Sequence, residues 1–128
     1  MSLDIRIEPP VNGSQRVVLA GRLDTQSYAQ LDERLAPLLR SPPRGSTLVL
    51  ELDGLAYISS AGIRSIFKAR KALSAVGGRV LVVNPQPQIQ KVFDLVKAVP
   101  MGDIFASTAE ADAYLDAMQR KVLEGDDG

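Results

Sequence analysis

Residues 57–63 read Tyr-Ile-Ser-Ser-Ala-Gly-Ile, and they lie where a nearly continuous apolar strand pattern gives way to an amphipathic helical pattern. A helix start presents backbone N–H groups without intrahelical acceptors and the positive end of the helix dipole, so it holds a negative charge favourably. Ser60 is therefore a physically sensible phosphate acceptor. The simpler interpretation is an ordinary N-cap, because serine is among the commonest residues at that position.

The composition excludes several kinds of chemistry. The 128 residues contain no cysteine, which rules out a disulfide framework, a thiolate nucleophile and a cysteine-based metal site. They also contain no histidine, the usual general base and the commonest neutral metal ligand. A Ser-His-Asp hydrolase is therefore excluded. Because no phosphate-binding loop or dinucleotide motif is present either, we assign no cofactor and no metal.

Charge and hydropathy point to protein partners. The 15 basic and 15 acidic residues balance without any block of like charge, which argues against nucleic acid or an anionic membrane as a partner. The first residues alternate apolar and charged side chains, unlike a signal peptide, and no apolar run approaches the length of a membrane span. We therefore expect a cytoplasmic protein without membrane insertion.

Apolar periodicity predicts alternating strands and helices. Residues 3–8 alternate as an edge strand does, and three runs that are apolar on both faces are expected in the middle of a covered sheet: 17–20, 48–50 and 80–83. Helical spacing predicts four helices, which contain Leu31, Ile66, Val92 and Leu115. A short strand around 104–106 would separate the last two helices.

Proline and glycine predict where elements end. Pro37 lies inside the first helical pattern, so we expect that helix to kink or stop near Ala36. Two other boundaries are marked by residues that favour turns, namely Gly77-Gly78 after the second helix and Asn84-Pro85 after the strand that follows it.

The order β-β-α-β-α-β-α-α defines an α/β fold, with a mixed four- to five-stranded sheet packed with about four helices. Its strand-helix-strand units are expected to be parallel. The length fits a single domain, which we place at residues 1–123. Residues 124–128 lack apolar side chains and are expected to be a disordered tail.

Three motifs resemble those of the STAS domains, whose simplest members are bacterial anti-sigma factor antagonists. The motifs are Gly21-Arg22-Leu23-Asp24 after the second strand, the segment from Leu52 to Gly62, and Gly77-Gly78 before the fourth strand. The likeness covers about residues 3–118. It implies a STAS fold and a regulator of transcription that acts by binding and not as an enzyme.

The central motif identifies the acceptor that the resemblance implies. In a typical antagonist it ends in Asp-Ser-Ser-Gly or Asp-Ser-Thr-Gly, and the hydroxyl directly after the Asp receives phosphate from a kinase. Alignment on Gly62 places Ser60 at that position, with Ser59 as a rival acceptor. The chain departs from the pattern at two positions, because Ser59 stands where many members have Asp and Ala61 where many have Ser or Thr. The missing carboxylate bears on which partner is recognised.

The resemblance further implies a partner-switching cycle. The unphosphorylated protein would bind an anti-sigma factor that is also a serine-protein kinase, phosphorylation would release it, and a PP2C-type serine phosphatase would reset the protein. We expect a monomer or a weak homodimer. The residues implied to bind the partner are Asp24, Ser59, Ser60, Ala61, Gly62 and Arg64.

Several alternatives stay open. Asp24 is equally explained as an ordinary turn or helix-capping residue, and Arg64, with Lys68 and Lys71 at helical spacing, as part of a solvated helix flank. The alternative function is an accessory STAS subunit of a lipid-type ATP-binding-cassette transporter, which would act as a binding module without phosphorylation. An enzyme with Ser60 as nucleophile and Lys68 or an acid as base is disfavoured, because the usual His and Cys groups are absent.

Overall fold

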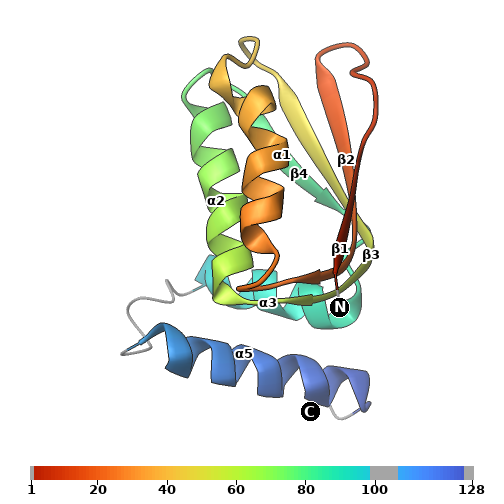
Figure 1. The fold of residues 1–128 in the computed structure, drawn as a ribbon, viewed down its shortest axis with the longest axis vertical. Helices are drawn as coiled ribbons and strands as arrows, with labels where there is room; N and C mark the ends of the chain where they lie inside the picture. Colours follow the sequence, from red (N-terminus) through yellow and green to blue (C-terminus); the bar gives the residue numbers. More distant parts are fainter. Residues whose placement is uncertain (1, 99–106, 126–128) are drawn as a thin grey trace.

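The computed structural model describes residues 2–98 and 107–125. In these segments, four strands form one sheet in the order β1-β2-β3-β4 (Figure 1). The edge strand β1 (Leu3–Ile7) pairs antiparallel with β2 (Ser14–Leu23), whereas β2 with β3 (Thr47–Ile58) and β3 with β4 (Arg79–Val83) are parallel. The mixed sheet, its parallel units and the edge position of the first strand are confirmed.

Helices α1 (Tyr28–Arg40) and α2 (Ser60–Ser74) lie side by side on one face of the sheet (Figure 1). Helices α3 (Pro87–Ala98) and α5 (Thr108–Leu123) lie at the end of the sheet where β3 finishes and α2 begins. The predicted element order is confirmed for the described residues, and the strand expected at 104–106 lies outside them. One buried cluster joins all these layers through leucines such as Leu19, Leu35, Leu50 and Leu115.

The first helix does not stop near Ala36, one of the two outcomes predicted there, because α1 continues through Pro37 to Arg40. Proline removes the N–H that would bond to the carbonyl of Glu33. Both Glu33 and Pro37 are exposed, so water can solvate that carbonyl. The last turn also places Leu38 and Leu39 against the core, and this burial favours keeping it helical.

The prediction that residues 80–83 lie in the middle of a covered sheet is wrong, whereas the runs 17–20 and 48–50 do fall in the central strands β2 and β3. Because α1 and α2 lie on the same face, side chains of the opposite face are only partly buried, including Val18 and Val49. Residues 80–83 belong to β4 at the edge of the sheet, where Leu81 is 39% exposed. Branched apolar residues favour strands because of their backbone preferences and their packing on the pleated surface, and not only because they are buried. An apolar run therefore does not show whether one face or both faces of the sheet are covered.

Glutamine side chains complete the free edge of β3. This strand continues beyond its last pairing with β4, between Glu51 and Val83, so the backbone groups that follow have no strand partner on that side. Gln86 donates to the carbonyl of Asp53 at 2.7 Å, and the buried Gln88 donates to the carbonyl of Ala56 at 3.0 Å. These amides supply partners for two carbonyls on the unpaired edge of β3, which extends as far as the start of α2.

The predicted turns at Gly77 and Asn84 are confirmed. Gly77 has φ of +73°, and the N–H of Gly78 donates to the carbonyl of Leu73 at 2.8 Å, a pattern that satisfies the end of α2. Asn84 follows β4 directly with φ of +53°.

Candidate functional site at the start of helix α2

The site is built where β3 passes into α2. Ser59 occupies the N-cap position in an extended conformation, with φ −103° and ψ 176°, and Ser60 is the first residue of the helix. The N–H of Ser59 donates to the carbonyl of Leu23 at 2.9 Å, and the carbonyl of Ser59 accepts from the N–H of Ile63 at 3.0 Å. The two serines are thus held between the end of β2 and the first turn of α2.

Both serine hydroxyls are buried and have no hydrogen-bond partner. Ser59 and Ser60 are each 3% exposed, and neither Oγ atom makes a hydrogen bond with the described part of the chain. The plain N-cap interpretation requires the side chain to accept from an N–H two or three residues later, and that bond is not formed. A buried hydroxyl without a partner costs free energy, so such a group calls for an explanation beyond folding.

Gly62 allows the first turn of α2 to approach β2 closely. A Cβ atom at this position would lie 2.7 Å from Cγ of Leu23, 2.9 Å from the carbonyl oxygen of Leu23 and 2.9 Å from Cγ1 of Ile58. Any larger residue would therefore push the helix away from the strands. The glycine on which the motif was aligned has a direct steric role here.

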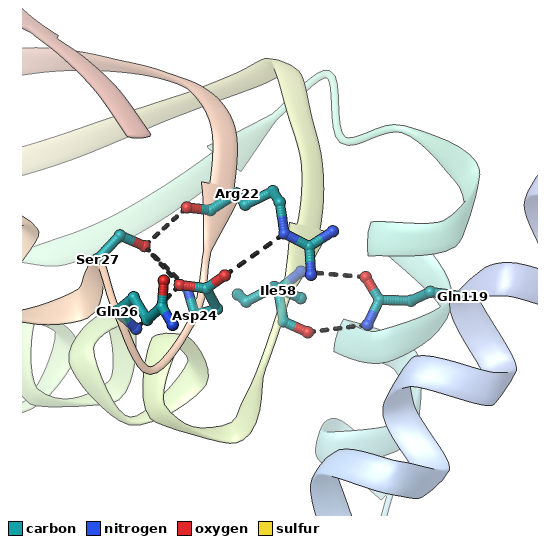
Figure 2. Close-up of polar contacts among 6 residues, drawn as sticks. All are labelled: Arg22, Asp24, Gln26, Ser27, Ile58 and Gln119. Carbon is teal, nitrogen blue, oxygen red and sulfur yellow. Dashed lines mark hydrogen bonds and ion pairs between the residues drawn. The ribbon is translucent and has the colours of Figure 1, made fainter. Parts of the chain in front are cut away.

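Helix α5 lies across the site and bonds to it through two polar side chains. Oδ1 of Asp112 accepts from the backbone N–H of Ser60 at 2.9 Å. Gln119, which is 1% exposed, accepts from the N–H of Ile58 at 3.0 Å and donates to the carbonyl of the same residue at 2.8 Å (Figure 2). A glutamine amide thus takes the place of a neighbouring strand at the end of β3.

The Asp24 carboxylate organises the turn between β2 and α1. Its Oδ1 accepts from the N–H of Gln26 at 3.0 Å and lies 3.2 Å from Oγ of Ser27 (Figure 2). Ser27 Oγ in turn accepts from the N–H of Asp24 at 2.9 Å and lies 2.7 Å from the carbonyl oxygen of Arg22. This geometry is the turn role that the sequence left open for Asp24. The side chain keeps 20% exposure, so one edge still reaches solvent.

The pKa of Tyr57 is shifted by burial and by the charged groups around the site. The guanidinium carbon of Arg22 lies 4.0 Å from the centre of the Tyr57 ring, which is cation–π geometry. Burial raises the pKa of Tyr57 above 10.0, the negative charges of Asp116, Asp112 and Asp24 raise that pKa further, and the charge of Arg22 opposes them. Three carboxylates and one guanidinium therefore act on the ring, and the surroundings are predominantly acidic.

The other predicted partner-binding residues differ in their access to solvent. Arg64 is exposed on α2, next to the ion pair between Lys68 and Asp32 at 3.1 Å, as expected of a solvated helix flank. The predicted patch Ser59, Ser60, Ala61 and Gly62 is buried in this structure. The structure therefore brings the predicted residues to one end of the fold, but only Asp24 and Arg64 reach the surface.

Neither serine hydroxyl makes a hydrogen bond within the described part of the chain. No base is bonded to either hydroxyl, since Asp112 contacts the backbone N–H of Ser60 instead. The described ranges 2–98 and 107–125 hold no group of three or more acids suited to a metal ion. Over the same ranges, no helix is long and apolar enough to cross a membrane.

Sequence reasoning did not single out Asp112 and Gln119. One signal for Gln119 was present, because Ala111, Leu115 and Gln119 repeat at intervals of four residues along one face of α5 and are all buried. An amide in an otherwise apolar helical stripe indicates a specific buried partner. No such pattern marks Asp112.

The mixed sheet with two helices side by side on one face makes the chain a small α/β domain. The chain belongs to the STAS domain family, which matches residues 8–111. The family resemblance seen in the sequence is thereby confirmed.

The curated relatives are similar over part of the chain. An anti-sigma F factor antagonist of Lysinibacillus sphaericus is 29% identical over 75 residues, which cover 59% of this chain and 63% of that protein. BtrV of Bordetella bronchiseptica, which carries a provisional name as an anti-sigma factor antagonist, is 31% identical over 85 residues, or 66% of this chain and 72% of that protein. The match to the first of these relatives thus spans less than two thirds of its length.

The solved structures agree on the fold. The anti-sigma factor antagonist SpoIIAA in its unphosphorylated form is similar with a TM-score of 0.61 and 23% identity, over 72% of this chain and 83% of that chain. The phosphorylated form of Bacillus SpoIIAA is similar with the same TM-score and 22% identity, over 76% of this chain and 86% of that chain.

Proposed function

We propose that this chain is an anti-sigma factor antagonist that acts by binding. In the unphosphorylated state it binds an anti-sigma factor that is also a serine kinase, and phosphorylation of Ser60 ends that binding. A serine phosphatase of the PP2C type restores the binding state. The membership of the STAS family and the names of its curated relatives support this proposal.

One observation carries the assignment of the acceptor. The Ser60 hydroxyl lies in the first turn of a 15-residue helix and makes no hydrogen bond, so it has no capping role that would explain its presence. The start of a helix stabilises a phosphate through free N–H groups and the helix dipole. Ser59 shares the lack of a partner but occupies the N-cap position, and it is the rival acceptor.

The modification is an ordinary phosphoryl transfer. The γ-phosphoryl group of ATP passes to Oγ of Ser60, ADP leaves, and the hydroxyl proton goes to a base supplied by the kinase. The product carries about −1.5 to −2 charges at the former hydroxyl. A partner bound beside the start of α2 would then meet an uncompensated charge, and a penalty of several kcal/mol lowers affinity by roughly two decades or more.

The switch needs no change of fold. SpoIIAA has been solved in both forms, and both are similar to this chain with a TM-score of 0.61. We therefore place the change at the start of α2 and at what contacts it. Asp24 and Arg64 extend the proposed binding surface on either side of that point, because they are the predicted residues that reach solvent.

The first test is peptide mass spectrometry of the protein isolated from its native host. We expect phosphate on Ser60 under at least one growth condition. Repeated absence of phosphate with full coverage of the peptide would contradict the switch, and co-purification with a transporter ATPase would favour the accessory-subunit function instead.

The second test is the affinity for the kinase that co-purifies with the protein, measured by calorimetry. Ser60→Ala should bind as the unmodified protein does and resist phosphorylation, whereas Ser60→Glu should bind more weakly. Ser59→Ala is the matched control and should remain a substrate. Equal affinities for Ser60→Ala and Ser60→Glu would contradict the proposed mechanism.

A further inference from the structure

The acceptor hydroxyl of Ser60 is covered by the chain itself. The serine is 3% exposed, and helix α5 is bonded directly to its backbone N–H through Asp112. A kinase has to place the hydroxyl in line with the γ-phosphate of ATP, and a buried hydroxyl cannot be placed there. Access therefore requires α5 to move.

The Asp112 carboxylate already bonds to the backbone at the start of α2, where the helix dipole favours an anion. Its Oδ1 lies 2.9 Å from the N–H at the first residue of α2, which is the group that stabilises an anion at a helix start. A phosphate attached to Ser60 would meet this carboxylate at short range, and two like charges in one desolvated position disfavour each other. One of the two anions must leave, and only the carboxylate is free to do so, because it belongs to a separate helix.

We propose that α5 is a built-in cover of the phosphorylation site, fastened by Asp112 and Gln119, and that a phosphate on Ser60 displaces Asp112 and releases the cover. The inference rests on the proposed function and adds the element that regulates it. It also gives the unpartnered Ser60 hydroxyl a reason, since this residue is bonded to a helix that can leave.

The coupling works in both directions. If phosphorylation weakens the docking of α5 by some factor, docking of α5 disfavours phosphorylation by the same factor. A hydrogen bond to a charged group corresponds to roughly tenfold to a hundredfold in an equilibrium constant. A partner that draws α5 away would therefore make Ser60 a substrate, and phosphorylated protein would present the face of α5 that now contacts the end of β3.

The chain offers a direct test that needs no kinase, because it contains no cysteine. In Ser60→Cys the only thiol lies beneath α5, and its rate of reaction with a soluble disulfide reagent reports how often α5 opens. Ser74→Cys, at the exposed end of the same helix, is the matched control. We expect Ser60→Cys to react at least about tenfold more slowly than Ser74→Cys, and addition of Asp112→Ala to speed it by about tenfold. Equal rates for the two single-cysteine proteins would overturn the proposal.

A second measurement covers the case in which a variant fails to fold. Phosphoserine is incorporated during translation at position 60 or, as control, at position 74, and hydrogen–deuterium exchange of Thr108–Leu123 is compared. We expect exchange of this helix to rise by about tenfold with phosphate at position 60 and to stay unchanged with phosphate at position 74. Unchanged exchange with phosphate at position 60 would refute the release of α5. Both measurements test the release of α5 and do not test the proposed function. The proposed function is contradicted by a different result, namely that the host never phosphorylates Ser60.

Discussion

Replacement of Gln119 by leucine should detach α5 and lower the stability of the domain. The substitution keeps a side chain of similar volume in a position that is 1% exposed, and it removes both bonds to the backbone of Ile58, at 3.0 Å and 2.8 Å. Ile58 is itself 0% exposed, so its N–H and carbonyl would be left without partners. Each unsatisfied group costs about 1–3 kcal/mol, which places the total at about 2–6 kcal/mol while the site stays dry.

The protein can avoid part of that cost by opening locally. If α5 leaves, water reaches the backbone of Ile58, and the loss is then limited to the docking energy of α5. That energy includes burial of the Leu115 side chain, worth about 1.5–3 kcal/mol. We therefore expect the effect to be concentrated in α5, with faster amide exchange in this helix and a smaller change in β2 and β3.

The assay combines urea denaturation with hydrogen–deuterium exchange on three proteins. Gln119→Glu retains the shape and the acceptor, but it places a second oxygen against the carbonyl of Ile58 and buries a charge, so it should be at least as damaging as Gln119→Leu. Gln90→Leu, at an exposed position on α3, is the matched control and should stay within about 0.5 kcal/mol of the parent. If Gln119→Leu matches that control in both measurements, the reasoning about α5 is refuted.

Three further predictions concern other contacts of the same fold. Gly62→Ala should lower the free energy of unfolding by about 1–3 kcal/mol through the clash with Leu23, although alanine normally stabilises a helix; a more stable variant in urea denaturation would contradict the close approach. Arg16→Ala should lower the free energy of unfolding by about 1–3 kcal/mol, because it removes the 2.6 Å ion pair to the buried Glu51 carboxylate. Glu51→Gln should recover part of that loss in the double variant, and an unchanged denaturation midpoint for Arg16→Ala would count against the ion pair. Tyr57, followed by tyrosinate absorbance after the other two tyrosines are replaced by phenylalanine, should titrate above 10.0 and move down in Asp116→Asn without reaching 10.0, since burial is the larger cause. Because the folded-state pKa of Tyr57 is raised, the stability that this residue contributes is complete below pH 10.0 and is lost as the pH rises through the raised pKa. A measured pKa of 10.0 for Tyr57 would disprove this pH dependence.

Local patterns in the sequence predicted the elements but not how they are covered. Apolar spacing predicted the element order, and the handover from strand to helix at residues 57–63 gave the position of Ser60. The same spacing could not show that α1 would continue past Pro37, since that depends on the burial of Leu38 and Leu39 in the assembled core. Likewise, it could not show that both α1 and α2 would choose one face of the sheet.

The contacts that distinguish this site are distant in sequence. Asp112 bonds to Ser60 across 52 residues, and Gln119 bonds to Ile58 across 61 residues. Periodicity reports which face of a helix is apolar, but it does not report which strand end that face will meet. The sequence therefore predicted Ser60 at the start of a helix, but it did not predict that this residue would be buried and bonded to α5 through Asp112.

The absence of an Asp at position 59 and the presence of Asp112 on α5 are related. In the motif that the chain resembles, an Asp stands directly before the acceptor. Here Ser59 stands at that position, and the carboxylate near Ser60 comes from Asp112 on α5. An acid on a separate helix can leave when a phosphate arrives, whereas an acid on the neighbouring residue cannot move away. On the proposal made above, the exchange replaces a fixed charge by one that a phosphate can displace. It predicts that restoring the acid by Ser59→Asp would weaken the docking of α5 through repulsion of Asp112.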